Sequence, residues 1–316
     1  MYLATVTCNR DFQQMLLQAE SIERFLNPCK HIIIVNESHP DLEFWNRWLS
    51  PYYKNHELII RGRIEYSYPA TSIGTRDHYG EVDSVSNGWR TQQLQKMLLA
   101  YEYDDDYLLL DSKNFFIKPT DLHEWENTIG SGTYSGFGQL SAFVGTYKNY
   151  VNLFGKEITY CIGPYTPFKV KREPLVNKCK IGELGYNLFY PEYRGAPASE
   201  GIFYSFFVED EIAKFLDIPF IKSKTVWLSE NLNLATELFS MTTDPTIKVA
   251  AIHREILSKI DSKDLKIIEL WLNNKSSVCL GFTNKIHPMP RDSHVRPKQY
   301  LYFNDYVIIA YDNTKV

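Results

Sequence analysis

Apolar positions in the first 110 residues follow two different periods. The runs Tyr2–Thr7, His31–Val35 and Tyr107–Leu110 are short and nearly unbroken, as in strands that are buried on both faces of a sheet. Residues 12–26 and 88–101 instead carry an apolar side chain every three or four positions, as one face of a packed helix does. Strands that alternate with helices predict an α/β domain with a mostly parallel sheet, right-handed crossovers and flanking helices.

The same patterns extend along the rest of the chain. A long loop is expected at 66–87, because this segment is rich in Tyr, Ser, Thr and Gly. Near the C-terminus aromatic and polar residues alternate, which predicts a small β appendage. We therefore expect one domain at 1–275 and a C-terminal β extension, packed on it, at 276–316. The other expected elements are a short helix at 44–49, a strand at 57–60, helices at 142–153, 200–215 and 238–273, and extended chain with turns at 159–171.

Composition narrows the class of protein. The chain has 316 residues and a formal net charge of −4, so no excess of positive charge points to nucleic acid or to an anionic membrane as a partner. No stretch approaches the roughly 18 apolar residues of a membrane span. The 5 cysteines include no Cys-x-x-Cys pair, which argues against a zinc ribbon or a disulfide framework and favours a reducing compartment. We expect a cytoplasmic protein.

The most informative polar residues follow the strand Tyr107–Leu110. Asp111, Lys113 and Asn114 stand directly after it, and the carboxyl end of a buried strand is where an open α/β sheet binds ligands. Oxygens of Asp111 and Asn114 are suited to a divalent cation, although the same residue types are frequent in ordinary turns. Lys113 between them is suited to phosphate oxygens. The preceding helix adds the polar residues Gln92, Gln95 and Lys96, which is more polar capacity than a core helix needs.

Two further segments carry candidate chemistry, each with a structural alternative. Glu200 opens an apolar helix, where a carboxylate is either a dipole-stabilised first residue or a general base on an acceptor hydroxyl. His253 and Arg254 follow an apolar run and are either packed or placed to contact phosphate or metal. The chain has no Gly-x-Ser-x-Gly, no His-Glu-x-x-His and no glycine-rich turn after the first strand, so hydrolase and nicotinamide chemistry find little support.

Several of these segments together resemble a known family. The segments are Thr5–Thr7, Asp11, Leu17–Phe25, His31–Val35, Gly88–Lys96 and Leu110–Asn114 with Lys118-Pro119, and more weakly 165–168, Glu200 and 252–254. They are similar to a bacterial and viral branch of the GT-A-type nucleotide-sugar glycosyltransferases, over about the first four-fifths of the chain. The resemblance implies a GT-A-like, Rossmann-like fold that binds a nucleotide-diphosphate sugar at the carboxyl ends of its parallel strands.

The resemblance also implies roles for particular residues. Asp111 takes the first position of the family's Asp-x-Asp metal motif, so Mn²⁺ or Mg²⁺ is the expected cofactor, with Asp111 and His253 as ligands. The third position departs from the motif, because Lys113 stands there in place of Asp and supplies part of the ion's charge. Glu200 is the expected acceptor-side carboxylate, with Asp111 and Lys113 as the other catalytic residues. The expected substrate-binding residues are Thr7, Asn9, Asn36, Arg90, Gln93, Lys96, Asn114 and Arg254.

These observations predict a glycosyltransferase that moves a sugar from a nucleotide-diphosphate donor to a hydroxyl of a glycan or another acceptor. The alternative is a non-catalytic nucleotide- or carbohydrate-binding protein on the same fold, in which Lys113 has displaced the metal. A nucleotidyltransferase is less favoured, because it needs a glycine-rich basic loop after the first strand, and only Arg10 is basic there.

Overall fold

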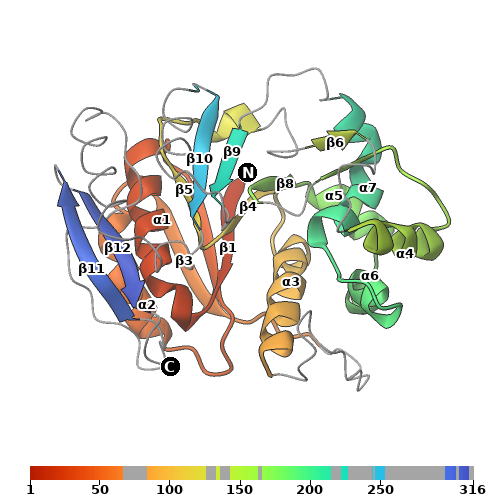
Figure 1. The fold of residues 1–316 in the computed structure, drawn as a ribbon, viewed down its shortest axis with the longest axis horizontal. Coiled ribbons are helices and arrows are strands. Elements are labelled where there is room, and N and C mark those ends of the chain that lie inside the picture. Colours follow the sequence, from red (N-terminus) through yellow and green to blue (C-terminus); the bar gives the residue numbers. More distant parts are fainter. Residues whose placement is uncertain are drawn as a thin grey trace.

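The computed structural model has a mixed α/β fold around a five-stranded sheet (Figure 1). It describes residues 1–66, 84–125, 133–135, 143–162, 166–214, 222–226, 244, 246–252, 296–303 and 306–312. The sheet has the order β3-β2-β1-β4-β8; its first four strands are parallel and β8 is antiparallel to β4. The expected α/β fold with a mostly parallel sheet is thus confirmed. The strands are β1 (Tyr2–Thr7), β2 (Lys30–Val35), β3 (Glu57–Gly62), β4 (Tyr107–Asp111) and β8 (Phe168–Val170).

Helices cover both faces of this sheet. α1 (Phe12–Phe25) and α2 (Leu42–Leu49) pack on one face and α3 (Ser84–Glu102) on the other (Figure 1). Strand residues alternate between the two cores: Leu3 and Leu108 face α1, whereas Ala4 and Leu109 face α3, as the two-residue period of a strand requires. The α3 helix begins at Ser84, inside the segment expected to be loop.

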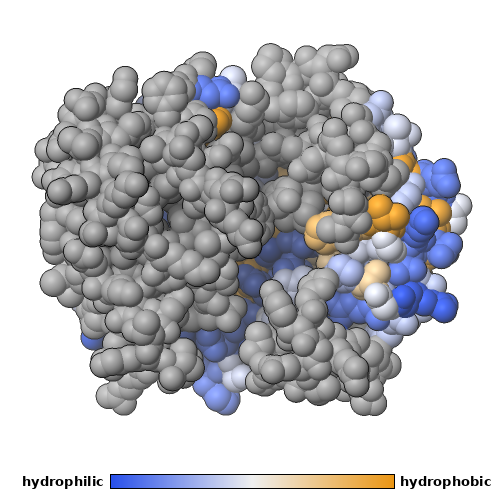
Figure 2. All heavy atoms as spheres, in the orientation of Figure 1, coloured by the Kyte–Doolittle hydropathy of each residue, from blue (hydrophilic) through white to orange (hydrophobic). Residues whose placement is uncertain are grey.

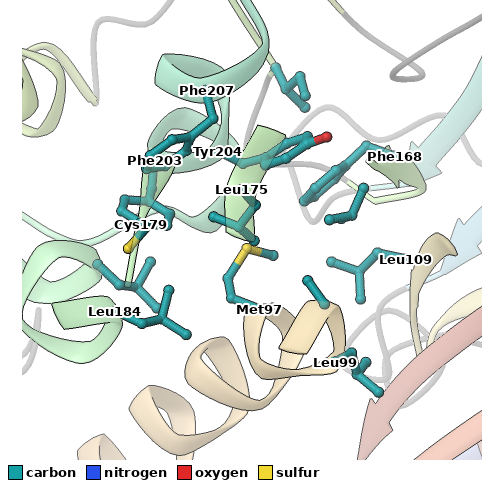
Figure 3. Close-up of a cluster of buried hydrophobic side chains, with 14 of the residues drawn as sticks. Met97, Leu99, Leu109, Phe168, Leu175, Cys179, Leu184, Phe203, Tyr204 and Phe207 are labelled. Atoms are coloured by element: carbon teal, nitrogen blue, oxygen red, sulfur yellow. The ribbon is translucent and has the colours of Figure 1, made fainter. Parts of the chain in front are cut away.

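A group of helices extends the core on the α3 side. It comprises α4 (Val144–Phe154), α5 (Arg172–Lys178), α6 (Ile181–Tyr193) and α7 (Glu200–Lys214). Figure 3 shows Met97 of α3 pointing toward Leu175 of α5, with Phe203 of α7 in the same apolar cluster. Sequence patterns predicted α4 and α7, but they gave no expectation for α5 and α6. Among the described residues there are also short 3-10 segments at Asn9–Asp11, Ser50–Tyr52 and Leu122–Trp125.

Smaller sheets complete the described structure. One of them corrects the sequence-based expectation: residues 247–252, predicted within a helix, form the strand β10 (Ile247–Ile252). β10 pairs with β5 (Asn114–Phe116) and β9 (Lys222–Val226). Val249, Ala250 and Ala251 are fully buried there, and Ile247, Val249 and Ile252 are β-branched residues that suit a paired strand. The other small sheets pair β6 (Thr133–Ser135) with β7 (Tyr160–Ile162), and β11 (Arg296–Phe303) with β12 (Tyr306–Asp312).

The strand order reverses direction at one place in the central sheet. From β1 the chain moves outward to β2 and β3, and then returns to place β4 on the other side of β1. In open α/β sheets ligands bind outside the carboxyl ends of the strands at such a switch point. Asp111 ends β4 at this point and lies beside Val6 of β1. In the described parts of the chain, no helix is both long and apolar enough to span a bilayer.

Candidate active site

A buried lysine joins two carboxylates at the switch point. The Nζ atom of Lys96 lies 2.8 Å from Oδ1 of Asp111 and 2.7 Å from Oε1 of Glu200. The three residues are far apart in the sequence and belong to three elements, α3, β4 and α7. The Lys96 side chain is 3% exposed, whereas those of Asp111 and Glu200 are 19% and 10% exposed. The lysine is therefore internal, and the two carboxylates reach the surface.

Local structure explains how the three side chains meet. Asp111 pairs with Val6 of β1 and therefore points to the α3 face of the sheet. Lys96 lies in the middle of α3, next to the apolar position Met97. Glu200 is the first residue of α7, where the positive end of the helix dipole favours a carboxylate. The structural interpretation of Glu200, as the first residue of a helix, is therefore confirmed.

A second lysine approaches Asp111 from its other side. The Nζ atom of Lys113 lies 3.1 Å from Oδ2 of Asp111, and the Lys113 side chain is 23% exposed. Burial alone would raise the pKa of the Asp111 carboxyl, but the ammonium groups of Lys96 and Lys113 outweigh it and hold this pKa well below its ordinary value. Burial would likewise lower the pKa of Lys96, but Asp111 and Glu200 raise it above its ordinary value. Asp111 and Lys96 are therefore both charged at neutral pH.

Glu200 has a further partner on α3. The side-chain amide of Gln93, oriented with its nitrogen toward the carboxylate, places that nitrogen 2.7 Å from both oxygens of Glu200. In the same orientation its oxygen accepts a hydrogen bond from Trp89 Nε1 at 3.1 Å. Trp89 is 39% exposed, so an indole ring with a fixed orientation stands at the surface beside Glu200. In Figure 2 the described surface over α3 is largely hydrophilic, and the surface over the helices α4–α7 beside it mixes hydrophilic and hydrophobic residues.

Two other polar residues of α3 have structural roles instead. Gln92 donates a hydrogen bond to the carbonyl of Val6 at 3.0 Å. Gln95 accepts from the backbone nitrogen of Ile64 at 2.7 Å and donates to its carbonyl at 2.9 Å. The polar face of the helix is thus divided between the site and the ends of two strands. Of the three polar residues Gln92, Gln95 and Lys96, only Lys96 therefore belongs to the site, where Gln93 joins it.

The turn that carries Asp111 and Lys113 is held from inside the protein. The Asn114 side chain is fully buried, and its oxygen accepts a hydrogen bond from the Asp111 backbone nitrogen at 2.7 Å. Asn114 therefore closes the turn and does not reach the surface of the described structure, in line with the turn alternative for this residue. From α1, the Gln18 amide donates to the carbonyls of Asp111 and Asn114, both at 2.8 Å. Gln18 thus fixes both ends of the turn.

Sequence patterns did not single out Gln18. It lies three residues after Met15 and four before Ile22, so it occupies the apolar face of α1, and it is itself fully buried. The helical period predicts an apolar residue at this position. The presence of a polar glutamine there was the signal that could have revealed Gln18. Burial of a side-chain amide costs free energy unless its hydrogen bonds are made inside the protein.

A chain of buried hydrogen bonds continues from Gln18 away from the site. Gln18 uses both amide hydrogens on the turn, so its oxygen accepts from the Thr5 hydroxyl at 2.8 Å. The Thr5 oxygen then accepts from Nε2 of His31 at 2.9 Å, and Nδ1 of His31 accepts from the Tyr53 hydroxyl at 2.7 Å. The network therefore assigns a neutral His31 with its hydrogen on Nε2.

This network predicts that lowering the pH destabilises the protein through His31. Burial, with a smaller contribution from His56, lowers the pKa of His31 to about 3. An unfolded chain binds a proton at His31 below about pH 6.5, and the folded chain does not. The contribution of neutral His31 to the free energy of unfolding is therefore present above about pH 6.5 and is lost as the pH falls from 6.5 toward 3. From pH 7 to pH 5 we expect the His31 contribution to fall by about 2 kcal/mol.

The measurement is urea unfolding of the wild type and of His31→Gln at both pH values. Glutamine can replace the donor to Thr5 but does not titrate, and His56 is present in both proteins, so its effect cancels. The wild type should lose about 2 kcal/mol more than the variant between pH 7 and pH 5. Equal losses would show that His31 is protonated in the folded protein.

The other predicted substrate-binding residues have different partners in the structure. Arg90 forms an ion pair with Glu192 of α6 at 2.6 Å. Asn36 donates to the Gly88 carbonyl at 2.9 Å and accepts from Arg63 at 2.8 Å, so these residues join the ends of β2 and β3 to the start of α3. Sequence patterns missed Arg63.

Thr7 and Asn9 lie on the other side of the sheet from the ion pairs. Thr7 is fully buried at the end of β1, and strand alternation turns it toward the α1 face, away from Asp111. The Asn9 side chain accepts from Trp45 Nε1 at 3.2 Å, and Trp45 is a core residue of α2. His253 and Arg254, predicted to contact metal and phosphate, lie outside the described residues.

The residues around Asp111 do not fit a divalent metal ion. Such an ion binds carboxylate oxygens at about 2.0–2.6 Å, so an ion on Asp111 would lie roughly 4 Å from both ammonium groups. Like unit charges at that distance repel by about 4 kcal/mol near a protein surface, and a divalent ion doubles this figure. Within the described ranges, no three His, Cys, Asp or Glu side chains are grouped so that they could hold a metal.

Comparison with known proteins gives structural neighbours only. No family model matches the chain, and no curated protein matches it. Mouse xyloside xylosyltransferase 1, in its apo form, is similar with a TM-score of 0.43 and 10% identity over 79% of this chain and 97% of that chain. The apo structure of WbbM, a bifunctional glycosyltransferase, is similar with a TM-score of 0.44 and 11% identity. That alignment covers 84% of this chain and 51% of WbbM.

Proposed function

We propose that the protein is a glycosyltransferase that moves a sugar from a nucleotide-diphosphate donor to an acceptor hydroxyl. The observation that carries the proposal is the Asp111–Lys96–Glu200 arrangement at the switch point of the sheet. Open α/β sheets bind nucleotides at this place. The cluster has two carboxylates on one internal lysine and an accessible second lysine beside them. It therefore offers groups both for the departure of the diphosphate and for the deprotonation of the acceptor hydroxyl.

The reaction breaks the bond between the anomeric carbon and the diphosphate oxygen, and forms a bond from that carbon to the acceptor oxygen. Negative charge develops on the diphosphate, and Lys113 is the accessible cation of the cluster that can stabilise it. The acceptor hydroxyl loses a proton, and Glu200 is the group proposed to receive it or to orient the hydroxyl. Lys96 and Gln93 hold Glu200 in place.

Glu200 also lies beside the exposed ring of Trp89, to which Gln93 connects it. An aromatic face is suited to the apolar face of a sugar ring. This neighbourhood favours Glu200 as the acceptor-side group and agrees with a glycan as the acceptor. Arg63 and Asn36, at the ends of β3 and β2, are proposed to lie near the nucleoside.

The test is release of free nucleoside diphosphate from a panel of nucleotide sugars, with and without simple saccharide acceptors. The wild type should release it from at least one donor, and faster when an acceptor is present. Asp111→Asn should abolish release, because both lysines lose their anchor. Lys30→Met should retain full activity, because this lysine pairs with Glu57 at the opposite end of β2 at 3.3 Å. No release from any donor would contradict the proposal.

A binding protein without catalysis is the second candidate, and the charge balance favours it. The formal charges of Lys96 and Lys113 are balanced by those of Asp111 and Glu200, so the cluster has no surplus positive charge to stabilise a departing diphosphate, although Lys113 can still contact a bound phosphate. A binder would show a thermal shift with nucleoside diphosphates, since ligands that bind the folded state stabilise it, but it would release no product from nucleotide sugars.

A further inference from the structure

Asp111 meets an ammonium group at each of its two carboxylate oxygens. Lys96 lies at 2.8 Å from Oδ1 and Lys113 at 3.1 Å from Oδ2. Gln18 and Asn114 fix the backbone of the turn, so the carboxylate has little freedom to turn away from either lysine. Each carboxylate oxygen therefore faces an ammonium group of the protein itself, and a metal ion bound to either oxygen would lie close to one.

The two lysines differ in how far they reach the surface. The Lys96 side chain is 3% exposed and is shared with Glu200, so it acts as an internal counter-charge. The Lys113 side chain is 23% exposed, and its three ammonium hydrogens allow it to bind Asp111 and a second anion together. Of the two ammonium groups that contact Asp111, Lys113 is therefore the more accessible.

We propose that this site binds the phosphate groups of its ligand without a divalent metal ion, through the Lys113 ammonium that Asp111 holds in place. The ligand class, a nucleoside diphosphate or its sugar ester, rests on the proposed function. The exclusion of metal does not rest on it, because that part follows from the two ion pairs at Asp111. Replacing Lys113 with an oxygen donor should therefore create a metal site where none exists in the wild type.

Manganese titration, followed by electron paramagnetic resonance, tests the exclusion of metal. Metal-stripped wild type should bind no Mn²⁺ at this site, and Lys113→Asp should bind one ion with an affinity about tenfold or more above any wild-type binding. The double variant Asp111→Asn, Lys113→Asp should lose that ion. Lys113→Asn, which keeps an oxygen donor without adding a charge, provides a second variant if Lys113→Asp does not fold.

The outcomes of this titration are decisive in both directions. A wild type that binds one Mn²⁺, lost in Asp111→Asn, would overturn the proposal. Absence of binding in every Lys113 variant that folds would also contradict it, because Lys113 would then not be what excludes the ion. Neither result depends on turnover, so failure of the proposed function is seen separately, as absence of nucleoside diphosphate release.

Thermal shift with a nucleoside diphosphate tests the phosphate contact. The shift should be the same in excess EDTA as in Mn²⁺, largely lost in Lys113→Met, and retained in Lys113→Arg and in the control Lys30→Met. A shift that disappears in EDTA, or one that survives in Lys113→Met, would overturn the assignment of Lys113. A wild type without any shift would overturn the ligand class while the manganese result stands.

Discussion

Replacing Lys96 with methionine is expected to lower the free energy of unfolding by about 3–5 kcal/mol. Methionine fills a similar volume but leaves Asp111 and Glu200 facing each other without the cation between them. Uncompensated charge in a buried place is among the costliest changes in a folded protein. Urea unfolding at pH 7, followed by circular dichroism, measures the loss.

Two comparisons separate this effect from a general loss of charge. Lys30→Met removes a lysine that is 36% exposed and paired with Glu57, so it should cost about 1 kcal/mol or less. Lys96→Met should recover part of its stability relative to the wild type as pH is lowered, because protonation of one carboxylate removes the repulsion. A loss below about 1 kcal/mol, comparable to that of a surface pair, would mean that the two carboxylates are solvated and do not form an internal site.

Replacing Glu200 with glutamine is expected to lower the turnover of a nucleotide sugar by about 10²–10⁴-fold, the usual contribution of a general base. Glutamine keeps the shape and one oxygen acceptor for Lys96, so the fold should be preserved. The KM for the donor should change little, because Glu200 is proposed to act on the acceptor. Initial rates of nucleoside diphosphate release at varied donor and acceptor concentrations separate these effects.

Glu211→Gln is the matched control, because it removes a carboxylate from the same helix. Glu211 pairs with Lys171 at 2.6 Å, near the other end of α7. Its replacement should leave turnover unchanged. If Glu200→Gln kept wild-type turnover, Glu200 would be a structural partner of Lys96 and not a catalytic group.

The order of strands and helices was predictable because it depends on local periods. The apolar run of β1 and the helical stripes of α1 and α3 are visible in consecutive residues, and the structure confirms these elements. Asp111 was found in the same way, since the end of a buried strand is recognisable without knowing its neighbours. The segment 247–252 shows the limit: it is a strand because β5 and β9 pair with it, and its sequence does not reveal those partners.

The partners of each charged group were decided only by the tertiary structure. The sequence placed Lys96, Asp111 and Glu200 in three separate segments, and nothing local indicated that one internal lysine joins the two carboxylates. Nor did the sequence show that Asn114 would close the turn or that Gln18 would hold it from α1. Periodicity reports which face of an element is buried, because burial repeats with the turn of the backbone. The identity of the opposing residue depends on long-range packing, and this is why the elements came from the sequence and the chemistry of the site from the fold.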